Sequence, residues 1–203
     1  MEAETSEIIH LRSDQLPSAA GVLGRAFFND PLMIFYLPDP SRREKIIPSL
    51  MLASLRYCHF YGEVYTTADF EGVACWLPPG QTEMNTFGLI RAGLGVVPIR
   101  IGIEALLRVA QIEPAVNRIH KASVPGPHWY LMILGVEPEK QGKGIGGRLL
   151  SSKISEAKES RLPFYLETMT KKNVAFYIRQ GFRVVFETDL PPGNLHTWMM
   201  IHP

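Results

Sequence analysis

The chain has 203 residues, of which 46% are hydrophobic and 20% are charged. This composition is typical of a globular protein and excludes a largely disordered chain. The net charge of +1 at pH 7 and the pI near 7.8 give no sign of a general polyanion-binding surface, so we expect no nucleic-acid partner. At this length we expect one domain that spans residues 1–203.

The first residues, the most apolar region and the two cysteines also limit the classes of protein that the sequence fits. Residues 1–14 are acidic and lack an apolar run, which argues against a signal peptide. The most apolar region, 87–110, is interrupted by arginines and a glutamate, so it falls short of the roughly 18 to 20 residues that cross a bilayer. Cys58 and Cys75 have no CxxC spacing, which indicates two buried thiols rather than a disulfide framework or a zinc site. We expect a cytoplasmic protein with no metal and no membrane partner.

The first half of the chain predicts helices mixed with short strands. Apolar residues at helical spacing indicate the helices, and short apolar runs between turn residues indicate the strands. The expected elements are a strand over 8–12, a helix capped by Asp14 that runs to Ala26, a break at Asn29-Asp30-Pro31, a helix from Pro40 to about Phe60, and two strands over 63–68 and 72–77.

Residues 81–127 keep the helical spacing but are divided by glycines and prolines. These dividers are Gly88, Gly93, Gly95, Gly102, Pro98 and Pro114. Because glycine and proline break or bend helices, we expect two helices here with a kink or turn between them.

The second half of the chain predicts a β-α-β-α-β-β order. A loop over 123–127 leads to an apolar strand, Trp129 to Val136. The later elements are a helix from Ile145 to about Glu159, a strand over 164–169, a helix over 172–180, and strands near 182–188 and 196–201.

Residues 141–147, QGKGIGG, are the most informative segment, because they join that apolar strand to a helix through four glycines. Glycine lets the backbone turn tightly and lets a ligand approach the main chain closely. The first turn of a helix carries unpaired N–H groups and the positive end of the helix dipole. Together these features predict a site for an anion such as a diphosphate.

Two known phosphate-binding motifs fit this segment poorly. Gly142 and Gly147 have the spacing of GxxxxGK[ST], but Arg148 and Leu149 stand where lysine and a hydroxyl residue are needed. The pattern GxGxxG is present, and Glu167 lies 20 residues beyond it, as in a dinucleotide site. That motif follows its strand directly, whereas here five residues intervene, and only 56 residues follow Gly147. A tight glycine turn with no ligand is a further alternative.

The segment resembles the signature of the GNAT superfamily of acetyl-CoA-dependent N-acetyltransferases, Gln/Arg-x-x-Gly-x-Gly/Ala. Gln141, Gly144 and Gly146 meet this signature, after a lead-in of Val136 and Pro138. The resemblance covers about 128–201. More narrowly, the stretches HWYLMILGVEPEKQGKGIG, FYLETMTKKNVAFYIRQGF and HTWMM look like the puromycin N-acetyltransferase type.

The resemblance implies a fold and a reaction. The fold is α/β (α+β), a mixed and mostly antiparallel central sheet of about seven strands, flanked by helices and splayed at its central strand. Residues 128–203 would form the acetyl-CoA-binding core and residues 1–127 the acceptor side. The reaction is direct acetyl transfer from acetyl-CoA to a primary amine of a small molecule, or of a peptide or protein, in a ternary complex. The enzyme would be a monomer or a homodimer.

The resemblance also implies which residues bind the cosubstrate. Backbone N–H groups of 141–147 would hold the pyrophosphate, with Lys143 as a further contact, and the strand end before them would pair with the pantetheine arm. The N–H of Val136 would stabilise the thioester oxygen. The implied cofactor-binding residues are Leu134, Gly135, Val136, Gln141, Gly142, Lys143, Gly144, Ile145, Gly146, Gly147, Asn173, Phe176 and Tyr177.

Tyr177 is the candidate acid, because a phenol with an ordinary pKa of about 10 is protonated at pH 7 and can donate to a departing thiolate. It lies four residues after Asn173, hence on the same helical face. The alternatives are a packed tyrosine for Tyr177 and a helix cap for Asn173.

Glu167 is the candidate base, because it follows an apolar run and could face a cleft where loss of water favours its protonated form. A salt-bridged carboxylate without a catalytic task is the alternative. His128 has suitable chemistry but stands alone at the strand entrance, which is more typical of a surface or structural histidine. His196 and Trp198 come near the last strand without a geometric reason to select them.

Two further functions stay open on the sequence. A non-catalytic acyl-CoA-binding sensor on the same fold needs no proton donor, so Asn173 and Tyr177 favour the enzyme. An oxidoreductase would need a nicotinamide or a flavin. Aromatic residues in 14–60 and 81–127 suggest a partly hydrophobic amine, and no carboxylate cluster for a highly charged acceptor is visible in the sequence.

Overall fold

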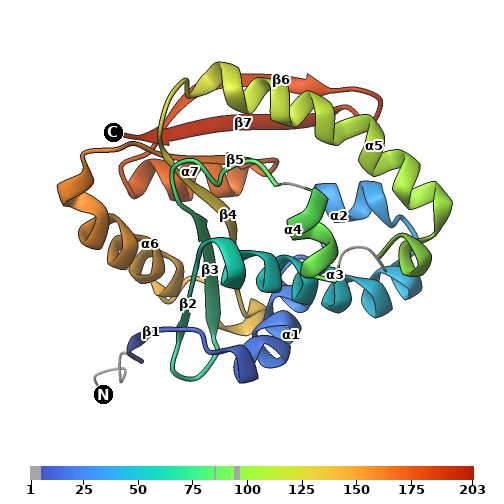
Figure 1. Cartoon of the computed structure of the whole chain (residues 1–203), viewed down its shortest axis with the longest axis horizontal. Helices are drawn as coiled ribbons and strands as arrows, with labels where there is room; N and C mark the ends of the chain where they lie inside the picture. The colour runs from blue at the N-terminus through green and yellow to red at the C-terminus, as the bar shows by residue number, and fades with distance from the viewer. Residues whose placement is uncertain (1–5, 85, 94–96) are drawn as a thin grey trace.

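The computed structural model describes residues 6–84, 86–93 and 97–203 (Figure 1). The first five residues of the acidic start and Gly95, one of the expected helix dividers, lie outside the described residues. The strands of this part of the chain are β1 (Ile8–His10), β2 (Glu63–Thr67), β3 (Gly72–Leu77), β4 (Trp129–Val136), β5 (Phe164–Thr168), β6 (Arg183–Leu190) and β7 (Leu195–His202). The helices are α1 (Leu16–Ala26), α2 (Pro31–Tyr36), α3 (Pro40–Tyr61), α4 (Thr86–Arg91), α5 (Val97–Ser123), α6 (Ile145–Glu156) and α7 (Lys171–Arg179).

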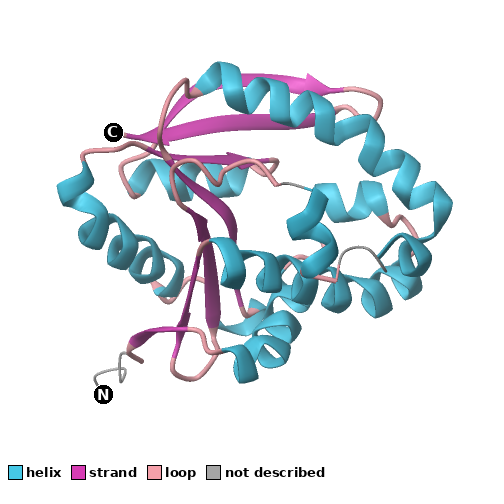
Figure 2. Cartoon of the chain, in the orientation of Figure 1, coloured by secondary structure: helices cyan, strands magenta, loops and turns pink. Residues whose placement is uncertain are grey.

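The strands form one seven-stranded sheet in the order β1-β2-β3-β4-β5-β7-β6. All neighbouring pairs are antiparallel except β4 and β5, which are parallel. This parallel pair is short: only Trp129 with Phe164 and Tyr130 with Tyr165 are in register. Figure 2 shows β5, β6 and β7 turned at an angle to β2, β3 and β4. The sheet is therefore split open along β4 after its first two residues.

Helices cover both faces of the sheet and form two apolar clusters. On one face, α1, α3 and α5 bury residues such as Leu23 and Ile47 against Ile133 of β4. On the other face, α6 and α7 bury residues such as Leu149 and Tyr177. Within the described ranges, no helix has both the length and the apolar character that crossing a bilayer requires.

The predicted mixed α/β architecture is confirmed, as are the elements of the β-α-β-α-β-β half. Gly102 has φ +80° and interrupts α5, which confirms the expected kink. Pro114, by contrast, lies inside α5 and does not end it. The expected Asp14 cap is wrong, because Asp14 lies in a short 3-10 turn over Ser13–Gln15 and pairs with Arg12 at 3.1 Å.

Candidate active site

The edge of β4 that faces the split in the sheet keeps free main-chain groups. The N–H of Glu137 donates to the carbonyl of Glu71 at 2.8 Å, and Gly135 is in register with Val73. Because N–H groups alternate along an antiparallel strand, those of Leu134 and Val136 point away from β3. They therefore face the side from which β5 has separated. The N–H groups of Leu134 and Val136 thus lie along a strand edge that has no neighbouring strand, while the carbonyl of Val136 accepts from the side chain of Gln141.

A β-bulge bends β4 just before this edge. Cys75 of β3 is in register with Ile133, whereas the next residue, Trp76, is in register with Leu131. Met132 is the extra residue, and a bulge of this kind increases local twist and redirects the strand. The bulge accompanies the departure of β4 from β5, and no feature of the sequence had predicted it.

The glycine turn between β4 and α6 leaves its amides without protein acceptors. Within the described residues, no acceptor is found for the N–H groups of Gly142 to Gly147, while that of Arg148 donates to Gly144 at 3.1 Å. Gly144 is the residue before the first turn of α6, and no side chain caps this helix. The segment therefore presents a row of unpaired donors at a helix N-terminus, which suits an anion.

Glycine occupies the four positions of the turn for two different physical reasons. Gly142 and Gly144 have φ of +79° and +80°, and a Cβ built on either would meet nothing within 4 Å. A Cβ on Gly146 would lie 3.2 Å from Phe176 Cζ, and one on Gly147 would lie 3.1 Å from the Gln180 side chain. The first two glycines permit the turn and leave open space beside it. The last two permit close packing of α6 on α7.

Gln141 links the turn to the open strand edge. Its side-chain amide donates to the carbonyl of Val136 at 3.3 Å, and Lys172 Nζ of α7 donates to its Oε1 at 3.5 Å. The turn, the edge of β4 and α7 are thereby held together in one region.

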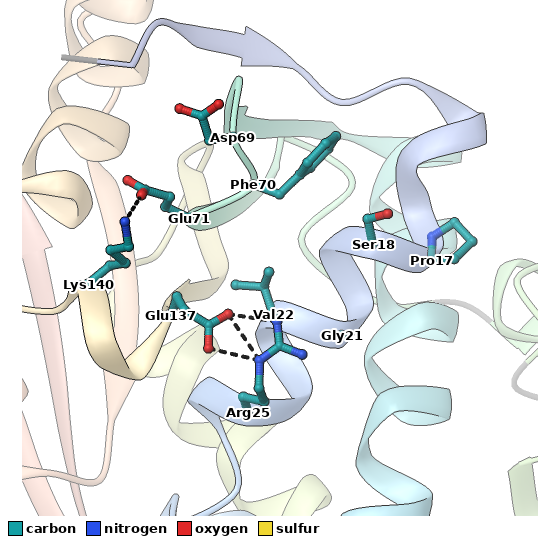
Figure 3. Close-up of a pocket in the computed structure, with 10 residues that line it drawn as sticks. All are labelled: Pro17, Ser18, Gly21, Val22, Arg25, Asp69, Phe70, Glu71, Glu137 and Lys140. Carbon is teal, nitrogen blue, oxygen red and sulfur yellow. Dashed lines mark hydrogen bonds and ion pairs between the residues drawn. The ribbon is translucent and has the colours of Figure 1, made fainter. Parts of the chain in front are cut away.

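A hollow of about 560 Å³ lies behind this region, between α1, the β2–β3 turn and the segment after β4 (Figure 3). Four of its charged side chains form ion pairs: Arg25 binds Glu137 at 2.7 Å, and Lys140 binds Glu71 at 2.5 Å. These pairs tie the short 3-10 turn Pro138–Lys140 to α1 and to the β2–β3 turn. These ion pairs thus anchor the approach to the glycine turn.

Tyr177 and Asn173 both lie on α7. Tyr177 is 7% exposed and packs between the rings of Phe176 and Phe182, with centroids 5.1 and 5.7 Å away. Burial, with a smaller effect from the charge of Asp30, raises the pKa of Tyr177 well above its ordinary value. Asn173 is not the helix cap, because Thr170 has that position and accepts from Asn173 Nδ2 at 3.2 Å.

Glu167 lies on β5 in a buried cluster of histidines. Its Oε1 is 3.3 Å from Nδ1 of His120, and the side chains of both residues are 9% exposed. His120 Nε2 lies 2.8 Å from His128 Nε2, and His128 Nδ1 lies 2.8 Å from the carbonyl of Gly126. Burial lowers the pKa of His128, and the positive charge of His120 when protonated lowers it further.

His128 is therefore not the lone surface histidine that the sequence suggested, because it is buried and paired. His196, by contrast, is half-buried and binds Asp189 at 2.8 Å on the β6–β7 hairpin. The cluster also contains a second carboxyl group, Glu113 of α5, which accepts a hydrogen bond from Tyr36 Oη at 2.7 Å. Burial raises the pKa of Glu113, and the charge of Glu167 raises it further.

The match to known families agrees with this geometry. Residues 107–184 match the family model described as an acetyltransferase (GNAT) domain. An uncharacterized N-acetyltransferase of Schizosaccharomyces pombe is 29% identical over 171 residues, which are 81% of this chain and 69% of the relative. The comparisons support a GNAT superfamily acetyltransferase. Enzymes of the GNAT superfamily use acetyl-CoA as the acetyl donor.

Solved structures agree on the fold. A structure described as histone acetyltransferase HPA2 and related acetyltransferase, from Corynebacterium glutamicum, superposes with a TM-score of 0.67 at 20% identity and covers 98% of this chain and 97% of that one. A putative arylalkylamine N-acetyltransferase 7 from the yellow fever mosquito has a TM-score of 0.62 at 15% identity, over 96% and 85% of the two chains. At these identities the likeness establishes the GNAT fold alone.

Sequence reasoning missed the partners of Glu167 in this GNAT fold, although their spacing carried a signal. Glu113 and His120 are seven residues apart, so they share one face of α5. On β5, Tyr165 and Glu167 are two residues apart and share one face of the strand. Spacing identifies each pair, but only the fold brings α5 across the start of β4 and β5.

The histidine cluster predicts a distinct pH dependence of stability. Because the pKa of folded His128 is lowered, the unfolded chain takes up a proton below about pH 6.5 that the folded chain refuses. Stability should therefore fall as the pH drops from about 6.5 towards 5. His128→Asn should flatten that slope by up to about 1.4 kcal/mol per pH unit, the limit for one proton.

Urea unfolding at several pH values measures this slope. His59→Asn, which removes a histidine from the last turn of α3 outside the cluster, is the control and should keep the wild-type dependence. An unchanged slope in His128→Asn would contradict a buried, neutral His128.

Proposed function

We propose that this chain is an acetyl-CoA-dependent N-acetyltransferase, that it transfers acetyl directly to a primary amine in a ternary complex, and that residues 1–203 act as one domain. One observation carries the proposal: the unpaired amides of Gly142 to Gly147 lie next to the unpaired edge of β4. A carrier with a diphosphate at one end and an amide-bearing arm at the other matches both features at once.

The glycine turn would bind the diphosphate. Its N–H groups need acceptors, and the space beside Gly142 and Gly144 is open. Lys143, between these two glycines, would add a charge-assisted contact. Asn173 and Phe176 would line the adjoining part of the site from α7, where Phe176 already contacts the turn.

The edge of β4 would bind the arm as an added strand pairs with a sheet. The N–H groups of Leu134 and Val136 point to that edge. Gly135 between them packs closely against α1, because a Cβ built on it would lie 2.5 Å from Leu23 Cδ2. The cosubstrate supplies an activated acetyl group as a thioester. The N–H of Val136 would donate to the carbonyl oxygen of that group, an interaction worth about 3 to 4 kcal/mol at the barrier.

Tyr177 would donate a hydrogen bond to the sulfur of the departing thiol. Its raised pKa keeps the phenol protonated at pH 7. A phenol with a pKa above 10 transfers its proton uphill to a thiolate of pKa about 8.5. The contribution of Tyr177 is therefore hydrogen bonding that strengthens as charge develops on sulfur, completed by proton delivery as the thiol leaves.

Glu167 would accept the proton that the amine must lose before it attacks. Glu113 and Glu167 together form a buried acidic pair, which favours an acceptor that arrives as a cation. Aromatic groups from α2 and β4 line the same region, including Tyr36 and Tyr130. We therefore propose a small primary amine with an apolar part. The puromycin N-acetyltransferase type stays a prediction on the sequence resemblance.

A thiol-release assay with acetyl-CoA and a panel of amines tests the proposal. The panel spans arylalkylamines, aminonucleosides, polyamines and peptides with free N-termini, and mass spectrometry confirms a gain of one acetyl group. Tight acetyl-CoA binding without transfer to any member would favour the acyl-CoA sensor instead.

Gly144→Ala should weaken coenzyme A binding at least tenfold. The added methyl enters the open space beside the unpaired amides and strains a backbone with φ +80°. Gly80→Ala is the matched control, because Gly80 has φ +83° and equally open surroundings but lies after β3, away from the turn. Both variants should lose similar stability, so calorimetric affinity separates them. Equal coenzyme A affinities of Gly144→Ala and Gly80→Ala would contradict diphosphate binding by the glycine turn.

Tyr177→Phe should lower turnover at least tenfold and leave acetyl-CoA affinity within about twofold. The change removes only the hydroxyl, while the ring keeps its packing against Phe176 and Phe182. Tyr61→Phe at the end of α3 is the control and should turn over normally. Wild-type turnover in Tyr177→Phe, with chemistry limiting, would remove Tyr177 from the mechanism.

A further inference from the structure

A line of three polar contacts runs from Gly126 to Glu167. It joins the carbonyl of Gly126 to His128 at 2.8 Å, His128 to His120 at 2.8 Å, and His120 to Glu167 Oε1 at 3.3 Å. The two short contacts are hydrogen bonds. At the third, Oε1 of Glu167 is buried and has no hydrogen-bond partner in the described part of the chain.

The carbonyl at one end fixes where the protons lie. It can only accept, so Nδ1 of His128 must carry a hydrogen. A neutral His128 then has a lone pair on Nε2, so Nε2 of His120 must carry the hydrogen of the second contact. A neutral His120 consequently turns a lone pair from Nδ1 towards the carboxylate of Glu167. The first two contacts are filled, and the third lacks a proton.

A count of protons shows what the third contact can do. Two neutral imidazoles and an ionised carboxylate hold two protons and a net charge of −1. One more proton makes the set neutral and gives every contact its hydrogen. In that state the imidazolium of His120 and the carboxylate of Glu167 form a buried ion pair, with Nδ1 3.3 Å from Oε1.

We infer that the contact between His120 and Glu167 is the proton acceptor of the acetyl transfer, and that His128 and the Gly126 carbonyl orient His120 for this task. The inference rests on the proposed function, and it replaces a single carboxylate base with a histidine-linked pair. His120 and His128 are positioning residues, because Glu167 is the group expected to meet the amine.

With this acceptor, both protons that the amine loses are accounted for. The acceptor enters as R–NH3⁺ and gives one proton to the pair, which becomes His120 Nδ1–H···Oε1 Glu167. The free amine forms the N–C bond as the C–S bond breaks, and the second N–H proton ends on the sulfur. The pair returns its proton to water before the next turnover, so the products are the amide, the thiol and one proton.

The surroundings hold few other groups that could take this proton. Besides His128, the titratable groups of the described residues that interact with His120 or Glu167 are Glu113 of α5, Tyr130 of β4 and Tyr165 of β5, and Tyr36 of α2 donates to Glu113. Tyr165 stacks on His120 with ring centroids 4.2 Å apart, and Tyr130 meets it edge-on at 4.7 Å. Burial raises the pKa of both phenols, so they stay protonated at pH 7, and it also raises the pKa of Glu113 above its ordinary value.

Nitrogen-detected NMR of the histidine side chains tests the proton positions without any ligand. Neutral His128 should carry its hydrogen on Nδ1, and His120 should carry one on Nε2. A neutral His128 with its hydrogen on Nε2 would overturn the orientation argument. This measurement needs no variant and does not depend on knowing the acceptor.

His120→Gln tests the role in catalysis with an alkylamine that the wild-type enzyme acetylates. We expect kcat/KM to fall about 100-fold at pH 7 and to recover towards the wild-type value by about pH 10, where solution supplies free amine. Acetyl-CoA affinity should stay within about twofold. The control is His196→Gln, which removes a half-buried histidine from β7, outside the histidine cluster.

The outcomes separate the two claims. If the wild-type enzyme acetylates no amine, the proposed function fails. The NMR measurement still tests which ring nitrogens of His120 and His128 carry a hydrogen. If the wild-type enzyme is active and His120→Gln keeps its rate, or loses the same factor at every pH, a purely structural role for His120 is established and the inference is overturned.

Discussion

The separation of β4 from β5 is the constraint on which the rest of the structure depends. These two parallel strands share only the pairs Trp129–Phe164 and Tyr130–Tyr165 before they diverge. The divergence leaves one edge of β4 without main-chain partners inside an otherwise paired sheet. Unpaired N–H and C=O groups at a strand edge invite an extended ligand. Both the cosubstrate arm and the amine can therefore be placed against one bent strand.

The two ends of the split carry complementary chemistry. At the carboxyl end of β4, the glycine turn offers unpaired amides and the positive end of α6. Nearer the amino end, Glu167 lies two residues beyond the last paired residue of β5, against His120 of α5 and close to Glu113 of the same helix. An anionic carrier and a cationic acceptor would thus be drawn to opposite ends of the same split, so that the acetyl group lies between them.

The sequence was most informative where local chemistry decides the structure. The spacing of residues 141–147 predicted the turn, and the continuous apolar run before it predicted β4 with its observed bounds, Trp129–Val136. It could not divide the glycines into those that leave open space, such as Gly144, and those that pack, such as Gly146, because only the position of Phe176 separates them. The sequence could not predict the pairing of His128 with His120 either, because this pairing depends on how α5 crosses the sheet.

A crystal structure with coenzyme A bound tests the central claim most directly. The account predicts phosphate oxygens about 2.7 to 3.2 Å from amide nitrogens of Gly142 to Gly147, with the pantetheine arm along Leu134 to Val136. Coenzyme A bound at another surface, with those amides donating to protein acceptors, would contradict it.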